Sequence, residues 1–360
     1  MRKLIAGMAA SLLVAILAFP CYAISAEKAY VLDADTKRVL YEKGADTRSL
    51  IASTTKIMTA LVVCEQSNVL DRMRIPAEAV GIEGSSMYLQ AGEVLTIQEL
   101  LYGLMLQSGN DAAVALAIYC GGTVEGFAEL MNDKAHQLGL TGTHFVNPHG
   151  LDAPEHYSTA RDLAVLSAYA MKNPIFAATV SCKTVRVGQR SMKNHNRLLW
   201  QCEGADGVKT GYTKKAGRIL VSSASRDGRR LVAVTINAPD DWNDHAFLLN
   251  EGFERYETKV VIEKGMTVGY YEIAGEATGY AQVVAAEDFA YPLAKDESVS
   301  FVLPKPGFIY APVVQGQNAG VVYVCVNGAV IGVCPVVFDR TVEQIQAPKK
   351  TIWQRLFGDS

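Results

Sequence analysis

Apolar residues follow two different spacings along the first 256 residues, and each spacing predicts its own kind of element. Apolar runs at 28–33 and 39–41, on either side of the polar turn 35–37, predict two strands. Helical spacing follows and predicts helices that begin near Ser53, Thr96, Asp111, Phe127, Ser158 and Pro174. Alternation returns near residue 183 and predicts strands over 184–187, 208–212, 218–224 and 231–236, followed by a helix over 242–256.

Turn and cap residues indicate where several of these elements end. Thr96 is followed three residues later by Glu99, which is the spacing of a capping box. Ser158 is the expected cap of the helix that starts at the next residue. Asp227-Gly228, between two apolar runs, predicts a two-residue hairpin turn.

Beyond residue 257 the pattern changes to short β runs separated by Gly and Pro. Asn327-Gly328 is the clearest hairpin turn among them. The change predicts a separate all-β domain at 257–340, after a first domain at 27–256. The runs lie at 260–262, 268–271, 281–284, 298–301 and 321–324.

The two ends of the chain carry patterns of their own. Arg2 and Lys3 precede an apolar run over 4–19, and small residues follow it, so the sequence predicts a signal peptide over 1–26. A retained membrane anchor is the alternative.

In the tail, 341–360, helical spacing places apolar side chains on one face beside three cations, which is typical of a segment that lies on a membrane surface. A frayed terminus is the alternative. We therefore expect an exported protein, associated with the outer face of the cell membrane. The residues concerned are Lys349, Lys350, Ile352, Trp353, Arg355, Leu356 and Phe357.

Composition excludes one class of partner. The chain has 360 residues and a formal net charge of −3, so it lacks the basic surface that nucleic-acid binding requires. Apart from Cys21, six cysteines remain, an even number that an exported chain could pair. Because they are scattered and some lie in apolar runs, we expect mostly free thiols.

Candidate chemistry begins with Ser53 and Lys56 at the predicted start of a helix. Residues three apart share a helix face, so the Lys56 amine can reach the Ser53 hydroxyl. A serine becomes a nucleophile when a neighbouring base takes its proton, and a lysine is such a base only when its pKa falls toward neutrality. Alone, this pair more often marks a capping serine and a surface lysine.

Two further motifs complete the pattern. Ser108-Gly109-Asn110 follows in a loop between two apolar helices, and Lys209-Thr210-Gly211 lies on a predicted strand. With Gly109 in place of Asp, the three motifs form the S-x-x-K, S-D-N and K-T-G set of penicillin-binding proteins and class A β-lactamases. On these motifs, and on the matching stretches 146–151 and 207–213, the sequence resembles the low-molecular-weight penicillin-binding proteins, the serine-type D-alanyl-D-alanine carboxypeptidases.

The resemblance implies an α/β (α+β) fold of the penicillin-binding and serine β-lactamase type. An antiparallel sheet would have helices on both faces and an all-helical subregion, and a small all-β C-terminal domain would follow. The implied reaction removes the terminal D-Ala from peptidoglycan stem pentapeptides through an acyl-enzyme, and β-lactams would acylate the same serine. Ser53 is then the nucleophile, Lys56 the general base and Ser108 the proton relay.

The resemblance also implies the residues that bind substrate. Asn110 would hold Lys56 and the substrate amide. Lys209 would supply positive potential for the terminal carboxylate and disfavour protonation of Lys56, and the Thr210 hydroxyl would bind that carboxylate. Gly211 would leave room for an extended peptide, and the backbone N–H of Tyr212 would complete the oxyanion hole.

No metal and no organic cofactor are implied. Histidines and carboxylates crowd one segment, but their spacing fits no standard zinc pattern, so we expect turn-structural roles for them. His195 and Arg197 either line the site or belong to an ordinary surface. Arg161 and Asp162 are an expected pair at a helix start. The crowded residues are His144, His149, Asp152, Glu155 and His156.

Three rival functions use the same motifs differently. A D,D-endopeptidase would cut peptidoglycan cross-links with the same site. A class A β-lactamase needs a carboxylate for deacylation, and its usual Glu-x-x-Leu-Asn pattern is absent. A catalytically idle peptidoglycan-binding protein would not need the reactive side chains that this chain carries.

Overall fold

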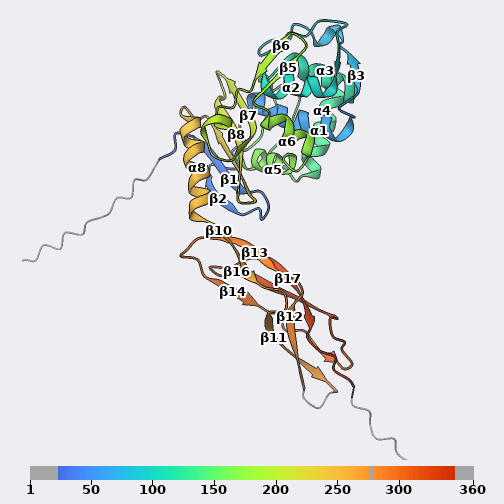
Figure 1. The fold of residues 1–360 in the computed structure, drawn as a ribbon, viewed down its shortest axis with the longest axis vertical. Helices are drawn as coiled ribbons and strands as arrows, with labels where there is room; N and C mark the ends of the chain where they lie inside the picture. The colour runs from blue at the N-terminus through green and yellow to red at the C-terminus, as the bar shows by residue number, and fades with distance from the viewer. Residues whose placement is uncertain (1–22, 276–278, 345–360) are drawn as a thin grey trace, which may run out of the picture.

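A computed structural model describes residues 23–275 and 279–344. Residues 1–22 of the predicted signal peptide (1–26) and residues 345–360 of the predicted amphipathic tail (341–360) lie outside the described residues. Two folded units follow one another along an elongated molecule, with the first unit at the top and the second below it in Figure 1.

The first unit is built on a five-stranded antiparallel sheet with the order β2-β1-β9-β8-β7. Asp227 and Gly228 have positive φ angles and join β8 to β9 as a two-residue hairpin, which confirms that prediction. β7 forms one edge of the sheet. The strands are β1 (Lys28–Asp33), β2 (Val39–Lys43), β7 (Ala205–Thr213), β8 (Gly217–Arg226) and β9 (Arg229–Ile236).

Helices cover both faces of this sheet. α8 (Asp241–Arg255) packs on β1, β8 and β9, whereas α5 (Ala160–Ala170) packs on β1 and β9 from the other side (Figure 1). α1 (Lys56–Gln66) runs beside α5 and leads into a helical subregion. That subregion contains α2 (Ile97–Leu106), α3 (Asn110–Gly121), α4 (Val124–Gln137) and α6 (Pro174–Ser181).

Short elements complete the first unit. They are η2 (Ala77–Ala79), α7 (Leu198–Gln201), and the hairpins β3 (Arg72–Arg74) with β4 (Val94–Thr96) and β5 (Thr184–Val187) with β6 (Arg190–Lys193). In residues 23–275 and 279–344, no single helix is long and apolar enough to cross a membrane, although the bent pairs α3–α4 and α5–α6 reach that length and apolarity together.

The helix caps bear out one prediction and correct another. Thr96 and Glu99 form the predicted capping box, in which each side chain accepts a hydrogen bond from the other residue's backbone N–H. The prediction for Ser158 is wrong, because Thr159 is the cap and its Oγ1 accepts from Asp162 N at 3.0 Å. Ser158 instead forms an isolated β-bridge with Ser49.

Arg161 and Asp162 do not pair with each other. The Arg161 guanidinium binds the Asp46 carboxylate, with Nε 2.6 Å from Oδ1. The Asp162 carboxylate accepts from Gly142 N at 2.8 Å. Both residues thus connect the start of α5 to neighbouring loops.

The second unit is all β. Its main sheet has the order β14-β16-β17-β12-β11-β15, and β10 pairs with β13 separately. Val326 pairs with Ala329 across Asn327-Gly328, which confirms the predicted hairpin. The strands are β10 (Glu257–Ile262), β11 (Thr267–Ala274), β12 (Tyr280–Ala285), β13 (Phe289–Leu293), β14 (Val299–Val302), β15 (Ile309–Tyr310), β16 (Asn318–Val326) and β17 (Ala329–Phe338).

Six cysteines of the described part of the chain are free thiols. Cys325 and Cys334 belong to adjacent strands but pair with Val330 and Val322, so they do not face each other. Burial raises the pKa of Cys64 to about 12, which keeps this thiol protonated and unreactive.

Arg38, in the connection between β1 and β2, joins the two units. Its guanidinium lies 4.6 Å from the Tyr256 ring centroid and 5.2 Å from that of Tyr291. It also donates to the Pro292 carbonyl and to the Glu297 carboxylate. One cation from the first unit is therefore enclosed by aromatic rings and acceptors at the junction.

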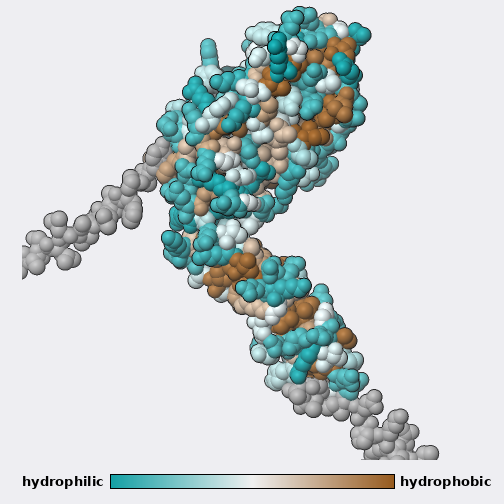
Figure 2. Space-filling view, viewed as in Figure 1, coloured by the Kyte–Doolittle hydropathy of each residue, from teal (hydrophilic) through white to brown (hydrophobic). Residues whose placement is uncertain are grey.

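On the face shown in Figure 2, hydrophobic residues gather in separate patches on both units, with hydrophilic residues between them.

Candidate active site

Ser53 lies in a single 3₁₀ turn, η1 (Ala52–Thr55), that runs directly into α1, so it lies near the start of a helix as the sequence predicted, and not as a helix cap. Ala52 has φ +45° there, a conformation that costs energy for a residue with a Cβ. Gly150 packs against this turn so closely that a Cβ would lie 1.8 Å from the Ala52 carbonyl oxygen. Residues three apart eclipse each other in a 3₁₀ turn, which brings Lys56 beneath Ser53.

The Lys56 amine is fully buried among three oxygen atoms. Its Nζ lies 2.9 Å from Ser53 Oγ, 2.7 Å from Asn110 Oδ1 and 2.8 Å from the His149 carbonyl oxygen. Burial, and after it the nearby Lys209, hold the pKa of Lys56 well below its usual range, against an opposing effect of Asp111. An uncharged amine therefore lies within reach of a serine hydroxyl.

The second motif forms the turn between α2 and α3. Ser108 has φ +59°, and its buried Oγ has no hydrogen-bond partner among the described residues. Asn110 is the first residue of α3, and its Nδ2 donates to the Glu83 carbonyl at 2.5 Å. The backbone N–H of Asn110 donates to the Ser85 carbonyl at 2.7 Å. The loop at 83–85 thus holds the amide that faces Lys56.

The third motif lies on the edge strand β7. Lys209 is only 1% exposed and donates to the Thr210 carbonyl at 3.0 Å, and burial lowers its pKa to about 7. A Cβ at Gly211 would lie 3.2 Å from the Ile51 carbonyl oxygen and 3.3 Å from Ser53 N. The missing side chain therefore lets β7 approach the Ser53 turn. The sequence had led us to expect Gly211 to leave room for the peptide substrate, which is a different role.

A cleft of about 980 Å³ opens above these motifs. The predicted residues Ser53, Ser108, Thr210, Gly211 and Tyr212 line it, while Lys56, Asn110 and Lys209 lie buried beneath. The opposite side comes from the β5–β6 hairpin and the segment after it, through Ser191, Lys193, Asn194, His195, Arg197 and Trp200. His195 and Arg197 thus line the cleft. The sequence had left open whether they line the site or belong to an ordinary surface.

Among the cleft residues that sequence reasoning missed, Arg218, Asp241 and Trp242 form one connected group. Arg218 Nη2 lies 2.7 Å from Asp241 Oδ1, and its guanidinium lies 5.9 Å from the ring centroid of Trp242. Arg197 lies 6.0 Å from the same ring. No local motif marks them, but the hairpin register would have placed Arg218 opposite Tyr212, beside the third motif.

The histidines near the site support the turns around it. His156 Nε2 lies 2.8 Å from Thr55 Oγ1, and the His149 carbonyl accepts from Lys56. Burial lowers the pKa of both imidazoles to about 4, so they are neutral at pH 7. Within residues 23–275 and 279–344 no group of three or more metal-ligating side chains is present.

Family models match both units. The family described as D-alanyl-D-alanine carboxypeptidase matches residues 16–240, and the family described as penicillin-binding protein 5, C-terminal domain, matches residues 256–344. Similar proteins include D-alanyl-D-alanine carboxypeptidase DacF of Bacillus subtilis, 32% identical over 93% of this chain and 90% of that protein. DacC of Escherichia coli is 34% identical over 87% and 83%.

Solved structures agree with this assignment. Penicillin-binding protein 5 from Haemophilus influenzae superimposes with a TM-score of 0.76 at 29% identity, covering 89% of this chain and 98% of that chain. The Streptomyces K15 DD-transpeptidase, at 36% identity and a TM-score of 0.63, covers 64% of this chain and 98% of its own. The predicted fold class, a penicillin-binding fold with an all-β C-terminal region, is confirmed. The chain belongs to the D-alanyl-D-alanine carboxypeptidase family.

Proposed function

We propose that this enzyme removes the terminal D-Ala from peptidoglycan stem peptides, and that Ser53 carries the acyl group during the reaction. The observation that supports this most directly is the 2.9 Å contact between Ser53 Oγ and the buried Lys56 Nζ, below an open cleft. The same serine would be acylated by β-lactam antibiotics. We expect these steps to need no metal or organic cofactor.

The surroundings of Lys56 favour a specific proton arrangement. A neutral amine has two N–H donors and one lone pair. The Asn110 amide oxygen and the His149 carbonyl oxygen can only accept, so they take both N–H groups. The lone pair would then face Ser53 Oγ, 2.9 Å away, and the serine hydroxyl would donate to it. Lys56 is therefore oriented as the general base before substrate arrives.

The oxyanion would lie between two backbone N–H groups, those of Ser53 and Tyr212. The close approach at Gly211 sets how near these two segments come, since no side chain separates them. Fixed donors of this kind each stabilise the transition state by about 3 kcal/mol. Backbone packing would thus contribute directly to the rate.

Ser108 and Asn110 would act on the other side of the scissile bond. Ser108 lines the cleft, and its buried hydroxyl has no partner among the described residues, so it would be available to pass a proton to the leaving amine. Asn110 is anchored by Glu83 and Ser85, and its Oδ1 would hold Lys56 in place beneath the cleft.

The terminal carboxylate of the substrate would bind near β7. The Thr210 hydroxyl offers a hydrogen bond there, while Lys209 is only partly charged at pH 7 because its pKa is about 7. Arg218 supplies a permanent cation at the same end of the cleft, oriented by Asp241 and the Trp242 ring. We assign the carboxylate to Thr210, Lys209 and Arg218 together.

We also propose where the enzyme works and how the chain is divided. A signal peptide over 1–26 would export it, a catalytic domain would span 27–256 and an all-β domain 257–340. The amphipathic pattern of 341–360 supports attachment of the tail to a membrane surface. The last described segment of the chain, coloured red, lies at the end of the second unit remote from the first unit (Figure 1). Because the cleft is lined by residues of the first unit, such an attachment would leave it unobstructed.

Intact-mass analysis after benzylpenicillin treatment tests the nucleophile. The wild type should gain one penicilloyl group and Ser53→Ala none. Ser191→Ala is the matched control, because Ser191 lines the same cleft and should leave the adduct intact. An unmodified wild type, or an adduct that survives in Ser53→Ala, would overturn the assignment. Release of D-Ala from a stem pentapeptide, but no cleavage of a cross-linked dimer, would separate carboxypeptidase from endopeptidase activity.

A further inference from the structure

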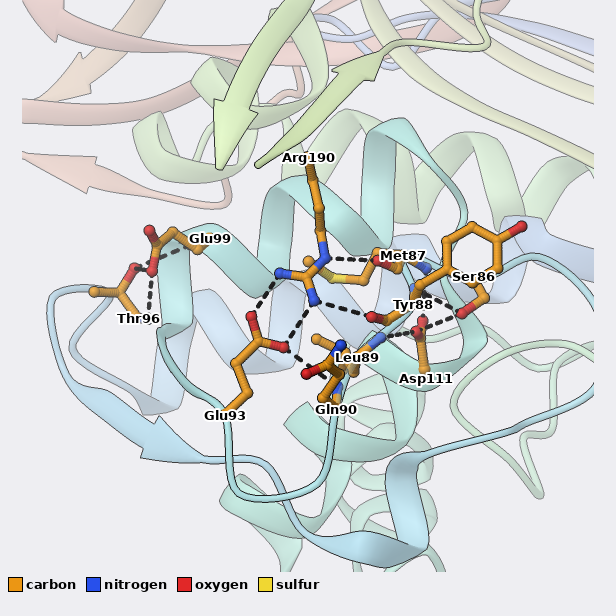
Figure 3. A network of polar contacts seen from close by, with 10 residues as sticks. All are labelled: Ser86, Met87, Tyr88, Leu89, Gln90, Glu93, Thr96, Glu99, Asp111 and Arg190. Carbon is orange, nitrogen blue, oxygen red and sulfur yellow. Dashed lines mark hydrogen bonds and ion pairs between the residues drawn. The ribbon is translucent and has the colours of Figure 1, made fainter. Parts of the chain in front are cut away.

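The loop at 83–91, which borders the cleft, is held on its inner side by Asp111. This carboxylate, 1% exposed in the first turn of α3, accepts from Ser86 Oγ at 2.6 Å, Met87 N at 3.1 Å and Leu89 N at 3.0 Å (Figure 3). Three bonds to one buried carboxylate fix the middle of the loop against α3.

Arg190, at the start of β6, holds the same loop from the other side. Its guanidinium binds both carboxylate oxygens of Glu93, at 2.6 and 2.7 Å. It also donates to the carbonyls of Met87 at 2.8 Å and Tyr88 at 2.9 Å (Figure 3). Tyr88 has φ +60°, an unfavourable conformation for a bulky residue, which persists only where its surroundings enforce it. Arg190 thus ties the β5–β6 wall of the cleft to the loop opposite.

The loop leads directly to the reacting groups. The Glu83 and Ser85 carbonyls bind the side chain and backbone of Asn110. Asn110 Oδ1 in turn accepts from Lys56 Nζ. A continuous series of hydrogen bonds therefore connects the loop that Arg190 clamps to the amine beside Ser53.

We propose that Arg190 is a positioning residue for acylation, which clamps the loop at 83–91 so that Asn110 keeps the Lys56 amine against Ser53. Arg190 touches neither Ser53 nor the substrate in this role. The inference rests on the proposed function, in which Lys56 is the base that activates Ser53.

Loss of the clamp has a defined electrostatic consequence. The charged and titratable groups that act on Lys56 are Lys209 from β7, Asp111 from α3 and His149 from the turn after residue 147. A loosened loop admits water to Lys56 and weakens the largest cause of its lowered pKa, which is burial. The pKa of Lys56 then rises, and a larger share of the amine is protonated at neutral pH.

The test is the rate constant of acylation by a fluorescent penicillin, measured from pH 5 to pH 10. Arg190→Gln should lower it roughly 10- to 100-fold at pH 7, because small displacements of reacting groups are costly. The loss should shrink at pH 9, since the rising limb of the profile moves to higher pH. Glu93→Gln should act in the same direction, and Arg190→Lys should recover part of the rate.

Arg186→Gln is the matched control, since Arg186 is exposed on the same hairpin and, among the residues that the structure describes, its side chain donates only to the Gly188 carbonyl. It should leave both rate and profile unchanged. Unaltered acylation in Arg190→Gln and Glu93→Gln, or a loss of equal size at every pH together with a lower melting temperature, would overturn the proposal. The mass adduct on wild-type Ser53 is read separately, so failure of the clamp and failure of the proposed function give different results.

Discussion

At the scale of single residues, Lys56 is committed to one protonation state by what surrounds it. A charged ammonium would be buried without a carboxylate partner, whereas the neutral amine satisfies two acceptors and one hydroxyl. Lys56→Arg tests this directly, because a guanidinium cannot give up its proton. We expect acylation by benzylpenicillin to fall by roughly 10²- to 10⁴-fold, the usual contribution of a general base. A Lys56→Arg enzyme with the wild-type acylation rate would exclude Lys56 as the base.

His245 makes the stability of the first unit depend on acid. Its ring lies buried on α8, with Nδ1 2.6 Å from Ser222 Oγ and Nε2 2.9 Å from Thr235 Oγ1, and burial lowers its pKa to about 3. The pKa of His245 is lower in the folded chain than its value of 6.5 in the unfolded chain, so below pH 6.5 a proton binds the unfolded chain first. The free energy of unfolding is therefore at its full value above pH 6.5 and decreases as the pH falls toward 3.

At pH 5 the cost from this one residue is about 2 kcal/mol. Urea unfolding at pH 7.5 and pH 5 measures it, and His245→Gln should reduce the difference between the two values. His136→Gln, on the exposed face of α4, is the control. An equal pH dependence in His245→Gln and the wild type would show that another group is responsible.

The motif residues could be predicted because each motif is contiguous and its chemistry can be read from residue types alone. Arg218 and Arg190 could not be found this way. Arg218 meets Asp241 and Trp242 only after β8 and α8 pack together, and Arg190 meets Glu93 across 97 positions of sequence. Arginine is common on surfaces, so its partners, and not its identity, reveal the role.

At the scale of elements, the 3₁₀ turn that carries Ser53 depends on a glycine from a distant loop. Gly150 has φ +89°, and an added Cβ would also lie 2.8 Å from Thr55 Oγ1. Gly150→Ala should therefore displace η1, lower stability by about 2–4 kcal/mol and abolish acylation.

Gly139→Ala is the matched control for this change. Gly139 also has a positive φ, +70°, but a Cβ there would meet no atom within 4 Å. It should cost only about 1 kcal/mol and leave acylation intact. Denaturant unfolding and the penicilloyl adduct, measured on both variants, separate backbone strain from displacement of Ser53. Similar behaviour of the two variants would contradict the steric argument.

Element types were easier to predict than element ends. The Asp-Gly and Asn-Gly hairpins were found because a two-residue turn with two positive φ angles strongly favours those pairs. The predicted cap of α5 was wrong by one residue because Ser158 and Thr159 both carry a hydroxyl that could cap the helix. The β-bridge between Ser158 and Ser49 leaves Thr159 as the cap. β3 and β4, three residues each, are too short for an alternating pattern to appear.

At the scale of the whole molecule, the two units were visible in the change of composition near residue 257, but their junction was not. Arg38 contacts residues more than 200 positions away, and nothing in its own neighbourhood indicates them. Arg38→Ala should loosen the junction, because it removes a poorly exposed ion pair and two ring contacts at once.

For Arg38→Ala we expect faster proteolysis near residue 256 and a wider distribution of molecular dimensions in small-angle scattering. Acylation by a soluble β-lactam should stay unchanged within about twofold. Arg255→Ala is the control, since the exposed Arg255 lies 5.6 Å from the same Tyr256 ring. Proteolysis and scattering identical to those of the wild type would show that the junction is held by other contacts.

The braced junction has a consequence for the polymer that the enzyme trims. The first unit, which contains the cleft, and the last described segment of the second unit lie at opposite ends of an elongated molecule (Figure 1), and Arg38 stiffens the junction between the two units. If the tail attaches this molecule to the membrane, the cleft would stay at a nearly constant distance from the lipid surface. Peptidoglycan chains that lie nearer to the membrane than the cleft, or farther from it, would keep their full-length stem peptides.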